Sequence, residues 1–161
     1  MRELQDIVMC LLDRDGTARD VNFESPTWEG LGDLMEFLEG GFEGVSCVDG
    51  EGRDWQGPLH ACPGVLLQKD GVALLDFHGG KGLVQELQVF VCLEDDGSPF
   101  VELTFAPEVV AATSSLRDDF IEWVEEMQAR LRSRRSFVRY ENASWRFGDT
   151  GAHSGVFLVT G

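Results

Sequence analysis

The stretch SSLRDDFIEWVEEMQARLRSRR, residues 114–135, decides the fold. Its apolar residues recur with the 3.6-residue period of an amphipathic helix: Leu116, Phe120, Trp123, Val124, Met127 and Leu131. Serines and acidic residues open the stretch and arginines crowd its end, as the helix dipole favours. We therefore expect a helix over residues 115–133 that covers a sheet, with Phe120, Trp123, Val124 and Met127 buried against it.

A second, shorter helix is predicted over residues 26–39. Ser25 and Pro26 supply a cap and a first-turn proline, and two glycines follow the last apolar residue. The apolar stripe of this helix consists of Trp28, Leu31, Leu34, Met35 and Leu38. Three acidic residues share the opposite face with an aromatic residue at its flank: Glu29, Asp33, Glu36 and Phe37.

The rest of the chain consists of short apolar runs joined by tight turns. We expect strands in residues 4–12, 21–23, 44–48, 65–68, 72–77, 83–93, 100–105, 137–140, 144–147 and 155–160. Runs connected by such short turns favour antiparallel pairing over parallel βαβ units. The prediction is an α+β fold, a single antiparallel sheet with two helices packed on one face, in one domain over residues 1–161.

The charge of the chain is strongly negative and unevenly spread. Its 13 basic and 29 acidic residues give a net charge of −16. Residues 1–126 carry a balance of −20, and residues 127–161 carry +4. Such a field repels nucleic acid and anionic lipid and speeds encounters with basic proteins. The alternative is that the acidity serves solubility alone.

Cellular location and cysteine chemistry follow from two further patterns. The sequence has no apolar run of about 18 residues and no signal peptide, so we expect a cytoplasmic protein without membrane contact. The four cysteines, Cys10, Cys47, Cys62 and Cys92, lie far apart and form no C-x-x-C pair. We therefore expect all four to be reduced and uncoordinated.

Motifs of catalysis or metal binding are weak in this sequence. His60 and Cys62, with Cys47 and His78 elsewhere, could supply zinc ligands, but a zinc site usually shows two close pairs. The HGGKG stretch, residues 78–82, lacks the pattern of a phosphate-binding loop, and we interpret it as a hairpin loop. No nucleophile elbow accompanies the histidines. We expect neither an enzyme nor a bound metal or cofactor.

Arginines and aromatic residues alternate after residue 129, as in some nucleic-acid-binding patches. The negative charge of the remaining chain opposes that interpretation at long range, so we expect no direct nucleic-acid binding. Acidic faces beside aromatic residues instead suit a basic protein partner. The predicted partner-binding residues are Glu29, Asp33, Glu36, Phe37, Asp49, Glu51, Asp54 and Trp55. An alternative site on the long helix consists of Asp118, Glu122 and Glu125.

The C-terminal sequence FVRYENASWRFGD, residues 137–149, with GVFLV at residues 155–159, resembles the small acidic immunity proteins of bacterial toxin systems. These systems include contact-dependent growth inhibition and other polymorphic toxins. The resemblance implies a cytoplasmic protein that binds and neutralises one cognate toxin, usually a nuclease. Nucleases are commonly basic because they bind phosphates, which agrees with the charge here. The runner-up hypothesis is an acidic adaptor or assembly protein for another basic partner, and the third is an enzyme of unrecognised class.

Overall fold

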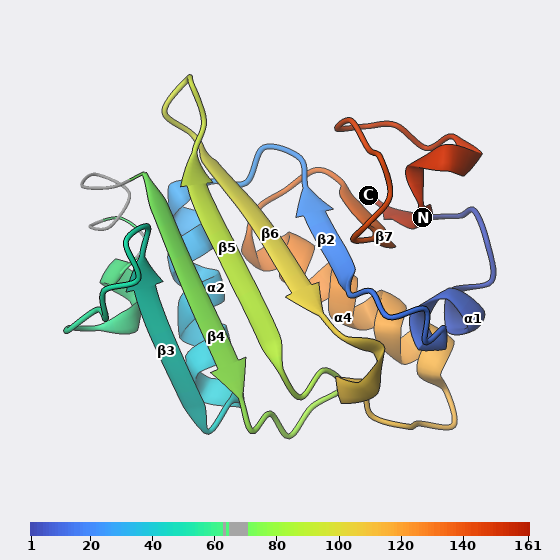
Figure 1. The fold of residues 1–161 in the computed structure, drawn as a ribbon, viewed down its shortest axis with the longest axis horizontal. Coiled ribbons are helices and arrows are strands. Elements are labelled where there is room, and N and C mark those ends of the chain that lie inside the picture. Colours follow the sequence, from blue (N-terminus) through green and yellow to red (C-terminus); the bar gives the residue numbers. More distant parts are fainter. Residues whose placement is uncertain (63, 65–70) are drawn as a thin grey trace.

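Among the residues that the computed structural model describes (1–62, 64 and 71–161), eight strands form one antiparallel sheet (Figure 1). Their order across the sheet is β1-β8-β7-β2-β6-β5-β4-β3. The strands are β1 (Arg2–Glu3), β2 (Arg19–Phe23), β3 (Gly44–Asp49), β4 (Val72–His78), β5 (Leu87–Leu93), β6 (Pro99–Phe105), β7 (Ser136–Tyr140) and β8 (Val156–Thr160). Each strand pairs antiparallel with its neighbours.

Two long helices lie together behind this sheet in Figure 1, α2 (Trp28–Gly41) and α4 (Leu116–Arg130). Shorter helical segments among the described residues include α1 (Ile7–Leu12), η1 (Leu59–Ala61), η2 (Pro107–Val109) and η3 (Ala152–Ser154). The predicted α+β fold, a single antiparallel sheet carrying helices on one face, is confirmed. None of the helices in the described part of the chain is both long and apolar enough to cross a membrane.

Helix α4 confirms the prediction for the opening stretch, although it begins at Leu116 and ends at Arg130, three residues before the predicted end at Ser133. Phe120, Val124 and Met127 are buried as predicted, and Ile121 joins them. Trp123 is only partly buried and stacks on Phe120, with ring centroids 5.8 Å apart. The helix stops because the chain turns into the left-handed region at Arg132, where φ is 56°.

Helix α2 begins two residues later than predicted. Thr27, not Ser25, is its N-cap, and the threonine hydroxyl accepts a hydrogen bond of 2.9 Å from the Gly30 amide. The predicted apolar stripe is buried except for Trp28, which is 40% exposed. The Trp28 ring nitrogen donates to the carbonyl oxygen of Gly97 in the β5–β6 turn, at 3.0 Å.

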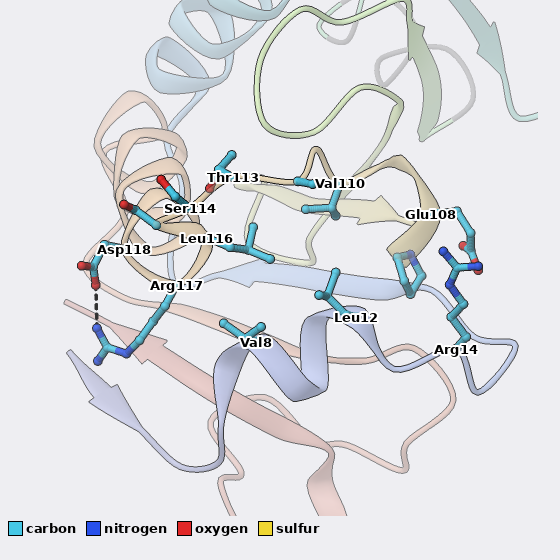
Figure 2. Close-up of a pocket in the computed structure, with 13 residues that line it drawn as sticks. Val8, Leu12, Arg14, Glu108, Val110, Thr113, Ser114, Leu116, Arg117 and Asp118 are labelled. Atoms are coloured by element: carbon cyan, nitrogen blue, oxygen red, sulfur yellow. Dashed lines mark hydrogen bonds and ion pairs between the residues drawn. The ribbon is translucent and has the colours of Figure 1, made fainter.

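The strand predicted over residues 4–12 is wrong, because Ile7–Leu12 form helix α1. Ile7, Cys10 and Leu11 are buried, a spacing of three and four residues that belongs to a helix. Fully buried Arg19 stabilises the end of this helix by donating to the carbonyl oxygen of Cys10 at 2.8 Å. Figure 2 shows α1 beside the first turn of α4, with Val8 and Leu12 directed towards Leu116.

Two further strand predictions need correction. Residues 144–147 form a loop rather than a strand, and the Trp145 ring packs on Phe137 with centroids 5.8 Å apart. Residues 83–86 precede β5 in an irregular segment, so the longest predicted strand begins at Leu87. The HGGKG stretch connects β4 to β5 as predicted. The strand predicted over residues 65–68 lies outside the described residues.

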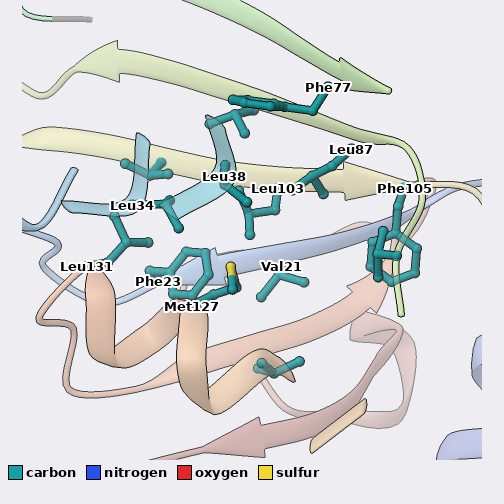
Figure 3. Close-up of a cluster of buried hydrophobic side chains, with 14 of the residues drawn as sticks. Val21, Phe23, Leu34, Leu38, Phe77, Leu87, Leu103, Phe105, Met127 and Leu131 are labelled. Atoms are coloured by element: carbon teal, nitrogen blue, oxygen red, sulfur yellow. The ribbon is translucent and has the colours of Figure 1, made fainter. Parts of the chain in front are cut away.

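The hydrophobic core lies between the sheet and the two long helices (Figure 3). Leu34 and Leu38 of α2 and Met127 of α4 point towards Val21 and Leu103 of the sheet. All five of these side chains are at most 2% exposed. The alternation of each strand therefore directs one set of side chains into this core and the other set to the opposite face.

The prediction of four reduced cysteines is wrong for two of them. Cys47 and Cys62 form a disulfide, with Cα atoms 7.3 Å apart, whereas Cys10 and Cys92 are free thiols. Cys47 faces inward from β3, and Cys62 follows η1, a segment that packs against α2. The fold thus brings together two cysteines that stand 15 residues apart in sequence, without any motif that marks them as a pair.

Candidate partner-binding surface

The solvent-facing side of α2 carries the predicted acidic residues, but two of them already have a cationic partner. Arg132, in the turn after α4, contacts Glu29 at 2.5 Å and Asp33 at 3.1 Å. Hydrogen bonds to these carboxylates, led by the one to Glu29, raise the pKa of Arg132. Glu36 is exposed and lies outside this pairing. The α2 face is therefore less negative than its sequence indicates.

Phe37 lies beside this acidic face and is 38% exposed. The guanidinium of Arg130 stands 4.4 Å from the centre of its ring. Arg130 also pairs with Glu126, one turn earlier on α4, at 2.7 Å. A partner that uses Phe37 as an anchor must contact Arg130 as well or displace it.

The turn after β3 owes its shape to Asp49. This residue is only 5% exposed, and its carboxylate accepts hydrogen bonds from the amides of Glu51 and Arg53, each at 2.9 Å. The Arg53 side chain adds an ion pair of 2.7 Å. The hydrogen bond from the Arg53 amide, followed by the other contacts, lowers the pKa of Asp49 to about 2. Asp49 therefore serves the turn, and its carboxylate is turned away from solvent.

Glu51 and Asp54 in the same turn are exposed, with Glu51 3.2 Å from Arg53. Trp55 is partly buried against the core, and its ring nitrogen donates to the carbonyl oxygen of Pro58 at 3.2 Å. The Trp55 amide donates to the carbonyl oxygen of Cys47 at 2.8 Å, which attaches the turn to the outer edge of β3. The eight predicted residues thus divide between the α2 face and the β3 edge.

The alternative acidic site on α4 is partly committed to other contacts. Asp118 pairs with Arg117 at 2.7 Å, and Arg117 also pairs with Glu3 at 2.7 Å. These bonds connect the first turn of α4 to β1. Glu122 and Glu125 are exposed further along the helix.

The arginines near the C-terminus, considered above for nucleic-acid binding, mostly contact acids from the rest of the chain. Arg130, Arg132, Arg135 and Arg139 each form an ion pair, at 2.5 to 3.0 Å, with carboxylates of Glu126, Glu29, Glu24 and Asp20 respectively. Folding therefore neutralises the positive segment internally. The charge asymmetry of the sequence does not become a basic patch at these four positions.

One polar cluster has no counterpart in the sequence predictions. On the sheet face opposite the helices, Asp20 pairs with Arg139 at 2.8 Å and accepts from the Thr104 hydroxyl at 2.7 Å. Asn22 bridges Arg139 and Glu102 through bonds of 3.1 and 2.8 Å. Burial raises the pKa of Asp20 to about 6. The alternation of polar and apolar residues in β2 is the sequence pattern that could have indicated this cluster.

A cleft of about 750 Å³ lies between α1, the loop after η2 and the start of α4 (Figure 2). Val8, Leu12 and Leu116 form its apolar wall. Figure 2 shows Arg14 beside Glu108 at one end and Arg117 beside Asp118 at the other. Because its lining residues include two arginines, two carboxylates and no histidine or cysteine, the cleft has balanced charge and no evident nucleophile with a base.

The histidines considered for metal binding are separated in the fold. His60 is exposed within η1, while His78 lines a shallow depression of about 350 Å³ with Asp76 and Glu86. Cys47 and Cys62 are engaged with each other. Within the described ranges, no three histidine, cysteine or acidic side chains converge in a geometry that could hold a metal ion.

Comparisons with known proteins give one informative likeness. No protein-family model and no curated protein matches the chain. A chain in the crystal structure of the toxic C-terminal tip of CdiA from Pseudomonas aeruginosa in complex with an immune protein is similar in fold. The TM-score is 0.59 at 16% sequence identity, and the match covers 89% of this chain and 94% of that chain. The likeness is one of fold, and it is compatible with either member of such a toxin–immunity complex.

Proposed function

We propose that this chain is an immunity-type protein that binds and neutralises a cognate basic toxin, a nuclease domain, through an acidic surface. The observation that carries the proposal is the net charge of −16. A nuclease domain that grips phosphates presents a basic surface, and an acidic protein approaches such a surface rapidly. The fold shared with a chain of a CdiA toxin–immunity complex supports the same role.

The sign of the charge also favours the immunity role over the toxin role. A nuclease toxin must approach a polyanion, and a net charge of −16 opposes that approach. The arginines that could grip phosphates at Arg132, Arg135 and Arg139 already contact carboxylates. The same charge would suit an acidic adaptor for another basic protein, so neutralisation itself has to be measured.

The acidic residues predicted from the sequence are the first candidates for contact with the partner, and their surroundings in the fold give them different roles. Glu36, Glu51 and Asp54 are the exposed acids available to a partner, and Phe37 and Trp55 are the aromatic contacts. Glu29 and Asp33 become available when a cationic group of the partner replaces Arg132 in their ion pairs. Asp49 contributes by holding the turn. The acids of α4, Asp118, Glu122 and Glu125, form the alternative surface.

We place the protein in the cytoplasm, where an internalised nuclease would act. The disulfide between Cys47 and Cys62 bears on this placement, because cytoplasmic thiols are kept reduced. The placement requires that the protein also folds and binds with both thiols reduced.

The test is neutralisation in living bacterial cells. The C-terminal domain of the protein encoded next to this chain is expressed from an inducible promoter, with and without the chain. We expect growth to stop without the chain and to continue with it. An unrelated acidic protein of similar size and charge serves as the control and should not protect. A complex of the two purified proteins without protection of the cells would support the adaptor role instead. Protection by the control protein would show that any acidic protein suffices, which would contradict the proposal.

A further inference from the structure

The face of the sheet opposite the helices has an unusual composition at one end. In an antiparallel sheet with one solvated face, the outward positions are normally polar. Here the outward positions at one end of β3, β4, β5 and β6 are apolar: Val48, Val72, Leu74, Phe90, Cys92 and Phe100. We call these six residues the outer apolar patch. All six are partly exposed.

The strand register places the patch in two adjoining rows. Leu74 lies opposite Val48 on one side and Phe90 on the other, and Cys92 lies between Val72 and Phe100. The rings of Phe90 and Phe100 meet edge to face, with centroids 6.3 Å apart. In Figure 1 the two long helices lie on the far side of these strands, so neither of them covers the patch.

The polar end of the same face provides an internal comparison. The next row of outward positions lies two residues further along each strand. It consists of Ser46, Asp76, Gln88 and Thr104, as expected for a solvated sheet. The apolar composition is therefore local to the patch. Contiguous apolar surface of this kind marks interaction sites in folded proteins.

The surroundings of the patch are acidic. Exposed Glu94 and Asp95 form the turn at the end of β5, and Asp76 lies in the next row. Glu102 continues the row of Phe90, although Arg139 lies 3.5 Å from its carboxylate. The outward positions of β3 to β6 include no lysine or arginine. A groove of about 460 Å³ extends the patch from Phe100 past this turn to Phe147, which is 48% exposed.

We propose that the outer apolar patch is the central docking surface for a basic protein partner, with Phe90 and Phe100 as anchors. This inference rests on the proposed function and names the surface that the toxin domain would cover. Aromatic anchors at the centre of an interface account for most of its affinity, and charges at the rim speed association and orient the partner. A second copy of this chain is a poor occupant, because each copy carries −16 and an acidic rim.

The patch and the α2 face lie on opposite sides of the sheet, which makes the two surfaces separable by mutation. The turn after β3 lies at the sheet edge between them, so a partner on the patch could also reach Asp54 and Trp55. Such a partner would leave Glu36 on α2 uncovered, so the outer apolar patch replaces the α2 face as the centre of the interface and shares with the predicted site only the turn after β3.

The test uses the C-terminal domain encoded next to this chain, in an inactivated form, as the binding probe. In the variant Phe90→Thr with Phe100→Thr, threonine keeps the strand preference and removes both aromatic anchors. We expect affinity to fall about 30-fold or more, mainly through faster dissociation. The matched control Gln88→Thr changes the polar row of the same face and should bind within about twofold of the parent chain. Equal affinity of both variants would overturn the inference.

A second measurement needs no substitution in the patch. Cys92 is a partly exposed free thiol within the patch, and Cys10 is a buried free thiol elsewhere. Bound probe should slow alkylation of Cys92 in the intact protein, whereas unchanged alkylation in a formed complex would overturn the inference. A dimer of this chain that Phe90→Thr dissociates would also overturn it, since a second copy would then occupy the patch. If the parent chain does not bind the probe at all, the proposed function fails instead.

Discussion

The Arg139 guanidinium lies 2.8 Å from the Asp20 carboxylate on the outer face of the sheet, and both side chains are largely withdrawn from solvent. The ring of Trp145 stands 5.0 Å from the same guanidinium. Burial raises the pKa of Asp20 despite this pairing, and the nearby charge of Glu102 acts in the same direction. The ion pair therefore depends on pH within the range where the protein can be handled.

The sign of this dependence follows from the direction of the shift. The pKa of Asp20 is about 6 in the folded chain, above its ordinary value of 3.8. Between these values the folded state holds a proton that the unfolded state has released, so the contribution of Asp20 to stability falls as pH rises. The shift corresponds to about 3 kcal/mol across this window.

We expect the variant Asp20→Asn to lack this dependence. The free energy of unfolding in urea is measured for both proteins at several values between about pH 4 and pH 7. The stability of the parent relative to the variant should decrease with rising pH and level off above about pH 7. A difference that stays constant, or that grows with pH, would show that Asp20 does not titrate as burial dictates.

Gly30 and Gly32 give a matched pair of substitutions on one helix. A Cβ atom at Gly30 would lie 2.5 Å from the backbone carbonyl of Leu131, where α2 crosses the end of α4, whereas one at Gly32 would meet nothing within 4 Å. We expect Gly30→Ala to lower the free energy of unfolding by about 1–3 kcal/mol through overpacking. Gly32→Ala should raise it by up to about 1 kcal/mol through helix propensity. Urea unfolding of both variants measures the difference, and equal effects would refute the close helix contact.

The sequence predicted those parts of the fold whose signal is local. The stripe of α4 and the alternation in β4 and β6 are read directly from residue spacing. Helix α1 was missed because a segment of six residues is too short for helical spacing to be distinguished from the alternation of a strand. Its cap by Asp6 and the bonds from Arg19 emerge only in the fold.

The candidate site shows the same division between local and distant contacts. Exposure of Glu29, Asp33 and Glu36 follows from helical spacing within α2. The pairing of Glu29 and Asp33 with Arg132 joins residues about a hundred positions apart, so no local pattern could reveal it. The outer apolar patch likewise combines residues of four strands, and its apolar character is visible only once the register is known.

The disulfide makes a prediction about thiol number and stability. Without reductant, thiol titration of the unfolded protein should give two free thiols, Cys10 and Cys92, and four after reduction. Closing a loop over 15 residues stabilises a protein by about 3 kcal/mol, so reduction should lower the free energy of unfolding by about that amount. The double variant Cys47→Ser with Cys62→Ser should reproduce the loss and show no further effect of reductant. Four titratable thiols in the unreduced protein would contradict the cross-link.

The last prediction concerns the α2 face and uses Arg132 as a switch. Arg132→Gln would release Glu29 and Asp33 from their ion pairs and make the face more negative. If a basic partner binds there, its association should become faster and more dependent on salt. Charge reversal at Asp33 and Glu36 together should slow association and flatten the salt dependence.

Arg134→Gln is the matched control, because it removes the same charge from the same turn and Arg134 is not the partner of Glu29 or Asp33. Association rates with the inactivated neighbouring domain are measured against ionic strength for all three variants. A larger increase for Arg132→Gln than for Arg134→Gln places the partner near α2. Equal increases would reflect net charge alone and exclude this face, and the same comparison at Asp118 and Glu122 would then test α4.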